Sequence, residues 1–190
     1  MKKYLLAMIS FSCVLFWASP AQAQSDQKPY LTKNFSGGSL SQLSVLTSGG
    51  SIEVEGSTTS TVKVEMYVRP NNWNGRSSLS KEEIEERLDN YDIVIKAAGN
   101  TVTASARRRD SGIWNNANSL SISFKVYTPR AFSTDLNTSG GSIRLASLNG
   151  TQTFKTNGGS IKVRDIKGDI NGRTSGGSIQ VANCSPNVVL

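Results

Sequence analysis

The sequence reads TSGGSI at residues 138–143, TNGGSI at 156–161 and TSGGSI at 174–179. The three copies are spaced by 18 residues each time, with no insertion or deletion between them. Each copy continues with an apolar residue two positions after its isoleucine, as in Ile143-Arg144-Leu145. Such alternation is typical of a β-strand with one buried face, and a fixed period is typical of a stacked-repeat fold.

The paired glycines before each strand predict a tight corner, where either φ is positive or two backbones approach closely. A unit of 18 residues is long enough for two short strands and two corners. We therefore predict an all-β fold in which residues 133–190 form regular coils of a parallel β-solenoid, or β-helix, with each strand pairing to the next coil. The repeat positions expected to carry this stack are Gly49, Gly50, Gly140, Gly141, Gly158, Gly159, Gly176, Gly177, Ile143, Ile161 and Ile179.

A fourth copy, TSGGSI at 47–52, is out of phase, because Gly49 precedes Gly140 by 91 residues, which is not a multiple of 18. We expect residues 34–190 to form a single domain in which the block between the copies, 57–131, is insertion-like and β-rich. The last C-terminal coil is expected to be truncated, because the chain reaches only the start of a further repeat.

Within this block the sequence predicts four strands and one helix. Alternating apolar residues indicate strands at 61–68 and 120–127 and a hairpin at 92–107 that turns at Gly99-Asn100. The sequence Ser80-Lys81-Glu82-Glu83 is a capping box and predicts a short helix over 80–90.

The N-terminus has the pattern of a secretory signal peptide. Two lysines precede an apolar stretch at 4–17, and the small-x-small sequence AQA follows at 21–23. The apolar stretch is shorter than the roughly 20 residues of a membrane-spanning helix. We expect cleavage of residues 1–23, a linker at 24–33, and export to the periplasm, the outer-membrane surface or the extracellular space, with no transmembrane segment in the mature chain.

The composition excludes several kinds of catalytic site. The chain contains no histidine, so Ser-His-Asp and Cys-His arrangements are impossible and the commonest general base is missing. Cys184 is the one cysteine left after signal cleavage, and no ladder of aspartates follows the paired glycines, as calcium-binding repeats require. Asp165 and Asp169 match no fixed catalytic arrangement. We expect a non-enzymatic protein with no metal and no cofactor.

The chain is modestly basic. Its formal net charge is +7, which falls to +5 when the two lysines within residues 1–23 are removed. Such a surface suits anionic polysaccharides, lipid headgroups or nucleic acid, or it simply provides solubility. The densest basic cluster, Arg107-Arg108-Arg109, is either a phosphate- or uronate-binding patch or a solvated strand end. No run of Lys and Arg is long enough to form an arm, so we expect no nucleic-acid partner.

Two loops hold both tryptophans of the mature chain. Tryptophan faces stack on sugar rings, and Asn amides both donate and accept hydrogen bonds. If the flanking strands are neighbours, both loops leave the same end of a sheet. They then form a glycan- or peptide-binding patch, or their tryptophans simply cover the core. The loops lie at 71–76 and 113–118, and their candidate ligand-binding residues are Trp73, Asn74, Arg76, Trp114, Asn115 and Asn116.

With these motifs the chain resembles the DUF4097 family of bacterial envelope proteins, whose members are described as "putative adhesins". The resemblance runs from about residue 34 to the end. It rests on the TSGGSI copies, the acidic helix after a Val-rich strand, GNTV at 99–102, and the strand that ends at Thr128-Pro129. It implies a right-handed parallel β-helix or a related β-solenoid, and adhesion without catalytic residues.

We therefore expect an exported, non-enzymatic β-repeat protein of the cell envelope that acts as an adhesin or as a surface or periplasmic scaffold. One alternative is a carbohydrate-binding module that uses the Trp- and Asn-rich loops. A second alternative is an envelope-stress or signalling accessory protein. The sequence leaves the partner open, with a glycan and another envelope protein as the candidates.

Overall fold

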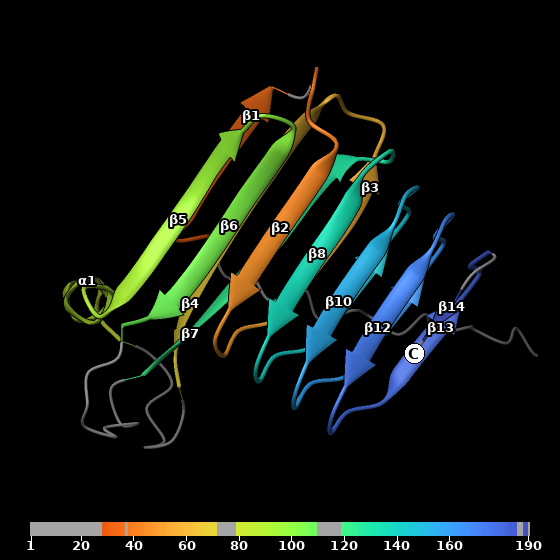
Figure 1. Cartoon of the computed structure of the whole chain (residues 1–190). Helices are drawn as coiled ribbons and strands as arrows, with labels where there is room; N and C mark the ends of the chain where they lie inside the picture. The colour runs from red at the N-terminus through yellow and green to blue at the C-terminus, as the bar shows by residue number, and fades with distance from the viewer. Residues whose placement is uncertain (1–27, 37, 72–78, 110–118, 186–187, 190) are drawn as a thin grey trace, which may run out of the picture.

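The structure, a computed structural model, describes residues 28–36, 38–71, 79–109, 119–185 and 188–189. These residues form an all-β fold of two seven-stranded mixed sheets and one short helix (Figure 1). The predicted all-β class is therefore confirmed. The predicted signal peptide and most of the two tryptophan loops lie outside the described residues.

The two sheets are called sheet A and sheet B. In spatial order, sheet A contains β1 (Leu31–Ser36), β4 (Thr61–Pro70), β7 (Leu120–Pro129), β3 (Ile52–Ser57), β9 (Ile143–Ala146), β11 (Ile161–Arg164) and β13 (Ile179–Ala182). Sheet B contains β5 (Tyr91–Ala98), β6 (Thr101–Arg108), β2 (Gln42–Thr47), β8 (Ser133–Thr138), β10 (Gln152–Thr156), β12 (Ile170–Thr174) and β14 (Val188–Val189). The helix α1 (Lys81–Leu88) lies between β4 and β5 in the chain.

The repeat half is built from parallel strands that step between the two sheets. Each 18-residue unit places one strand in each sheet, and equivalent positions pair directly, as Ile143 does with Ile161 and Ile161 with Ile179. In sheet B, Phe154 pairs in the same way with its equivalents one repeat before and after. Because the register equals the sequence period, chemically similar residues lie in rows across the strands.

The out-of-phase copy joins the same stack. Strand β3 pairs with β9 in the register Ile52 to Ile143, so the first TSGGSI lies beside the second in spite of the long separation. The block 57–131, expected to be insertion-like, extends both sheets: β6 pairs with β2, and β7 lies between β3 and β4. Strand β6 is parallel to β2, and β7 is parallel to β3. The two strands therefore act as one more layer of the stack.

Antiparallel strands close this end of the stack. Strands β1 and β4 add to sheet A, and β5 adds to sheet B. Strand β1 begins at Leu31, inside the segment 24–33 that was expected to be a linker. Lys33 of β1 donates a hydrogen bond from Nζ to the carbonyl oxygen of Ile95 on β5, at 3.0 Å. This hydrogen bond satisfies a backbone carbonyl group of the other edge strand. A charged side chain on an edge strand also disfavours pairing with further chains.

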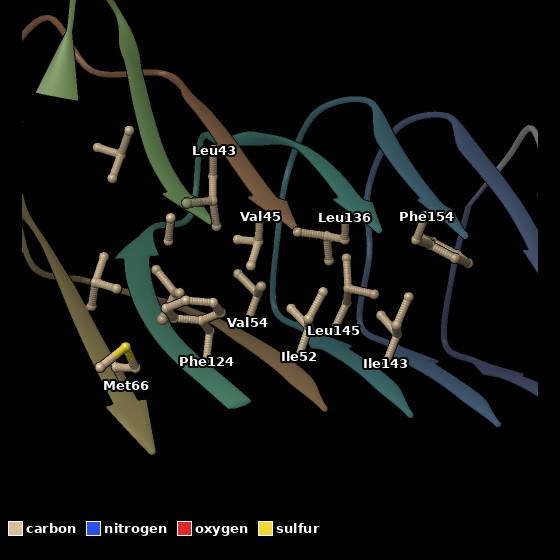
Figure 2. Close-up of a cluster of buried hydrophobic side chains, with 14 of the residues drawn as sticks. Leu43, Val45, Ile52, Val54, Met66, Phe124, Leu136, Ile143, Leu145 and Phe154 are labelled. Carbon is tan, nitrogen blue, oxygen red and sulfur yellow. The ribbon is translucent and has the colours of Figure 1, made fainter. Parts of the chain in front are cut away.

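The core lies between the sheets. Figure 2 shows Leu43, Val45, Leu136 and Phe154 of sheet B facing Ile52, Val54, Ile143 and Leu145 of sheet A. All eight are at most 2 % exposed. Volumes compensate along one row of sheet B, because the Phe154 ring occupies the space that a Cβ on Gly172 would need. Close packing of this kind makes the repeat tolerant of one large residue when its neighbour is small.

The helix and hairpin of the block follow their predicted signals. Helix α1 spans Lys81–Leu88 within the predicted 80–90, and Ser80 and Glu83 make both hydrogen bonds of the capping box, at 3.0 and 3.1 Å. Ile84 and Leu88 pack against the core from one face of the helix. Strands β5 and β6 form the predicted hairpin, with Gly99 at φ +58° in its turn.

The second glycine of each pair is needed because backbones approach closely. A Cβ built on Gly159 would overlap the carbonyl group of Gly141, and the same holds for Gly141 against Gly50. The φ angles of the paired glycines are not positive. Of the two reasons that the sequence offered, close approach is therefore the correct one. The positive φ values of the repeats occur at the opposite corner, at Ser147, Asp165 and Asn183 and at two single glycines, Gly150 and Gly168.

A threonine row ties each paired-glycine corner to the preceding coil. Thr156 donates from Oγ1 to the carbonyl oxygen of Gly141 at 2.8 Å and accepts a hydrogen bond from the amide of Gly159 at 3.2 Å. Thr138 and Thr174 repeat both contacts in their own coils. Each hydroxyl therefore satisfies one backbone donor and one backbone acceptor at the point where two coils meet.

Replacement of the two glycines of one pair should have very different effects. Gly159→Ala places a methyl group against rigid backbone, so we expect a loss of about 2–3 kcal/mol in the free energy of unfolding. Gly158→Ala is the matched control, because the nearest atom to its Cβ is 3.8 Å away, and a change within about 1 kcal/mol is expected. Urea denaturation measures both, and equal effects would contradict the close-approach account.

Thr156→Val tests the threonine row. Valine keeps the shape but removes both hydrogen bonds of a fully buried hydroxyl, so we expect a loss of about 1–3 kcal/mol in the free energy of unfolding. Thr153 on the same strand is exposed, so Thr153→Val should change the free energy of unfolding by less than about 0.5 kcal/mol. Thermal unfolding of both variants gives the comparison, and a neutral Thr156→Val would show that the row contributes little.

Candidate functional site: the outer face of sheet A

The outer face of sheet A presents polar side chains in rows that cross the strands. The central row takes one residue from each of six neighbouring strands, because their registers align. In spatial order from β4 to β13, the central row is Glu65, Lys125, Glu53, Arg144, Lys162 and Gln180. One face of the sheet thus carries a line of charges at strand spacing.

A shallow open groove lies along this face and is called the sheet A groove. It runs over β4, β7, β3, β9, β11 and β13, and its floor is the outer side of the strands. Its charged lining consists of two carboxylates and five cations, which gives the groove a net positive charge. These residues are Glu53, Glu55, Arg69, Lys125, Arg144, Lys162 and Arg164.

Charges on the β4, β7 and β3 side of the face are paired. Lys63 lies 2.9 Å from a carboxylate oxygen of Glu65, and the hydroxyl of Tyr67 donates to the same carboxylate at 2.9 Å. Lys125 lies 3.2 Å from Glu53. Cations thus neutralise Glu65 and Glu53, whereas Glu55 on β3, which also lines the groove, makes no ion pair within the described residues.

These contacts shift three pKa values. Burial disfavours the charged form of Glu65, but hydrogen bonds from Lys63 and Tyr67 outweigh it and hold the pKa of this carboxyl below its ordinary value of 4.5. Burial and the hydrogen bond to Glu65 raise the pKa of Tyr67 to about 12. Burial lowers the pKa of Lys125, but Tyr127 and Glu53 outweigh it and raise that pKa above its ordinary value.

The Tyr127 ring is covered by the same lysines. Lys63 Nζ lies 4.3 Å from the ring centroid, and Lys125 Nζ lies 5.3 Å from it. Both distances are within the range of cation–π attraction. The aromatic face that borders the groove is therefore occupied by the protein's own cations.

Charges on the β9 and β11 side are not paired. Arg144, Lys162 and Arg164 are exposed, and within the described part of the chain their side chains make no ion pair or hydrogen bond. The nearest carboxylate in register is Glu53, beside Arg144, and it already binds Lys125. Glu55, beside Ala146 in the row of Arg164, is the other carboxylate of β3 in the groove, so the groove changes from mixed charge to purely basic as it passes from β3 to β11.

Of the two tryptophan loops, 71–76 and 113–118, the structure describes only Asn71. The predicted ligand-binding residues Trp73, Asn74 and Arg76 and Trp114, Asn115 and Asn116 all lie outside the described residues. The strands before and after them, β4 and β7, are neighbours, as the loop hypothesis required. Asn71 and Ser119, which flank the loops, are joined by a backbone and a side-chain hydrogen bond, both 3.0 Å long. The chain therefore leaves β4 for the first loop and enters β7 after the second loop at the same end of sheet A.

The arginine cluster lies at the end of β6, beside the helix. Arg109 donates from Nη1 to the carbonyl oxygen of Asp89 at 3.2 Å, and its amide donates to Asn90. Asp89 is the C-cap of α1, so this guanidinium satisfies a terminal helix carbonyl. Arg107 is exposed, and Arg108 is half-buried. The cluster is on sheet B and does not join the sheet A groove.

The remaining sequence candidates lie at the corners. Cys184 takes the same slot of the repeat as Leu148 and Ile166, but it is half-buried where they are fully buried. Cys184 is the last residue of this row in the described chain. Asp165 accepts a hydrogen bond from Asn183 at 3.1 Å across coils, so it stabilises the corner. Asp169 is exposed at the same corner region.

The described residues contain neither a cluster of metal ligands nor a membrane-spanning helix. No group of three or more Cys, Asp and Glu side chains is arranged to hold a metal ion there. No helix in that part of the chain is long and apolar enough to cross a membrane.

Comparison with known proteins gives structural neighbours only. No family model matches the chain, and no curated protein matches its sequence. A "putative cell adhesion protein" from Clostridium sporogenes has a TM-score of 0.48 and 10% identity, covering 82% of this chain and 100% of that one. A "putative lipid binding protein" from Parabacteroides distasonis has a TM-score of 0.34 and 16% identity, over 84% of this chain and 63% of that one. A "putative adhesin" from the same organism has a TM-score of 0.34 and 12% identity, over 82% and 66%.

The shifted pKa of Glu65 predicts an acid-dependent stability. A carboxyl whose pKa is lower in the folded state stabilises folding above its unfolded pKa, and this contribution is lost as pH falls through the folded value. Glu65→Gln should therefore flatten the fall of Tm below about pH 4.5, where 4.5 is the ordinary value. Calorimetry of wild type and variant across pH 2–7 measures this.

Glu86→Gln is the control for Glu65→Gln. Glu86 is exposed on α1, so its replacement removes one surface charge without touching the Lys63 and Tyr67 contacts. We expect its Tm to follow pH as in the wild type. Parallel pH profiles for wild type and Glu65→Gln would contradict the assigned role of the carboxylate.

Proposed function

We propose that this chain is an exported, non-enzymatic protein of a bacterial cell envelope that acts by binding, as an adhesin or as a scaffold. The observation that carries the proposal is the sheet A groove, a continuous surface over six strands whose side chains lie in rows. A surface of this kind presents many equivalent contacts along one direction, which suits an extended partner.

The residues that line the groove are suited to contact rather than to chemistry. Their polar groups are hydroxyls, one amide, carboxylates and cations. The chain contains no histidine, so a neutral-pH general base of the usual kind is missing from its composition. Export is supported by the signal-peptide pattern at residues 1–23.

We also propose that the repeat half is a short β-solenoid in the sense of the DUF4097 resemblance. The support is the strict 18-residue register in both sheets, together with the paired-glycine corner that recurs at Gly50, Gly141, Gly159 and Gly177. In such a fold the outward rows are a direct product of the coil spacing.

The binding role is tested with isolated envelopes. Envelopes from the native bacterium lacking this gene are mixed with the purified mature protein, and co-sedimentation is measured. We expect the wild type to sediment with the envelopes, because the groove meets an envelope component. Failure of the wild type to bind would overturn the proposed function.

The groove itself is tested with a matched pair of variants. Ala146→Trp fills the sheet A groove, because Ala146 lines it. Thr153→Trp places the same ring on the opposite outer face, at an exposed position of β10. We expect only Ala146→Trp to weaken binding, by about tenfold or more, as for loss of an interface contact. Equal binding by both variants would place the binding surface elsewhere.

A further inference from the structure

The open basic part of the sheet A groove is distinct from the rest of the face. It consists of Arg144 on β9 and of Lys162 and Arg164 on β11, and it is called the basic step. No carboxylate lines the groove on these two strands. Three exposed cations without a described partner repel one another, so an anionic group bound between them would be stabilised.

The basic step has a regular spacing. Arg144 and Lys162 are register partners on adjacent parallel strands, so their Cα atoms are about 4.8 Å apart. Lys162 and Arg164 point to the same face two residues apart on one strand, about 6.6 Å. A linear polymer with an acidic group on successive units meets such a set of cations at several points at once, which raises affinity by avidity.

Neutral hydrogen-bonding groups border the basic step. Gln180 continues the central row beyond Lys162, and Ser51 and Ser123 line the groove on the other side. Amides and hydroxyls both donate and accept hydrogen bonds, as sugar hydroxyls do. Guanidinium and ammonium groups bind carboxylate or sulfate by charge-assisted hydrogen bonds. The combination matches a polymer that carries both hydroxyls and anions.

Other polyanions fit this surface less well. Single-stranded nucleic acids bind to surfaces that offer free aromatic faces for base stacking. The Tyr127 face is covered by two lysines, Tyr67 lies on β4 at the far side of the groove, and β9 and β11, which carry the basic step, have no aromatic side chain. A membrane-binding surface places large apolar side chains beside its cations, whereas the register partners that flank Lys162 and Arg164 on the outer face are Gln180, Ala146 and Ala182.

We propose that the basic step binds the anionic groups of a linear acidic glycan, carrying uronate or sulfate, laid along the sheet A groove across the strands. This inference rests on the proposed function and names its ligand class. Arg144 and Lys162 make the first contacts, because they are register partners in the central row. Arg164 contacts the polymer from the neighbouring row, two residues after Lys162 on β11.

The test uses the mature protein and purified polysaccharides. Binding is measured by isothermal titration calorimetry to polygalacturonate, which carries carboxylates, to dextran sulfate, which carries sulfates, and to neutral dextran. We expect binding to one or both anionic polymers, weaker at higher salt because the contacts are ionic, and none to neutral dextran. Preference between the two anionic polymers identifies the acidic group. No binding to either at low salt would overturn the proposal.

The chain offers a matched pair of charge variants. Arg144→Gln with Lys162→Gln removes the two register partners of the basic step, and Gln already stands at the next position of this row, at Gln180. Lys155→Gln with Arg173→Gln removes one lysine and one arginine that are register partners on the outer face of sheet B. Both double variants lower the net charge by two and leave the core untouched.

The two double variants separate a site from overall charge. We expect the first to weaken anionic-glycan binding about tenfold, as for the loss of two charge-assisted contacts, and the second to change it by less than about twofold. Equal losses in both would overturn the proposal, since net charge alone would then explain binding. Envelope binding that survives in both variants, together with no glycan binding, would refute the ligand class and leave the proposed function standing.

Discussion

The close approach of backbones at the paired-glycine corner is the constraint on which the rest of the structure depends. A carbonyl group of one coil lies where a Cβ of the next would be, and a threonine hydroxyl joins the two. This contact recurs at every step from Ile122 to Gly177. Because it sets the distance and the register between coils, it also places isoleucine over isoleucine in the core and cation beside cation on the outside.

The same regularity explains why the sheet A groove has two electrostatic parts. The strands contributed by repeats carry Arg144, Lys162 and Gln180 at equivalent positions, so the row has no carboxylate there. The strands of the 57–131 block and of the first copy carry two ion pairs, Lys63 with Glu65 and Lys125 with Glu53. The strands at equivalent repeat positions therefore concentrate positive charge on this face, whereas the other strands carry charges of both signs that form ion pairs.

The 57–131 block also gives the stack a closed end. It leaves β3, forms an antiparallel edge, and returns through β6 and β7 to lie against the first copy. At that edge Lys33 bridges the two sheets through the Ile95 carbonyl group. Polar closure of this kind satisfies backbone groups that an edge strand would otherwise expose.

Much of this fold could be predicted from local patterns. The 18-residue period, the alternation of apolar residues, the capping box at Ser80 and the turn at Gly99 each depend on neighbours in the chain, and each is present in the structure. The sequence could not decide whether the glycine pair is needed for a close approach of backbones or for a positive φ, because both favour glycine equally. The inward-facing residues of the repeats were also correct, since alternation determines the buried face.

Other features depend on which distant segments meet. The sequence by itself determined that this is a repeat-containing β protein with a recurrent corner. Only the tertiary structure decided that the copy at Gly49 lies beside that at Gly140, that the block 57–131 extends both sheets, and that the unpaired cations share one groove. The physical reason is that strand pairing is non-local: the backbone hydrogen bonds that join β3 to β9 are the same for any sequence, so only packing over the whole stack selects that neighbour.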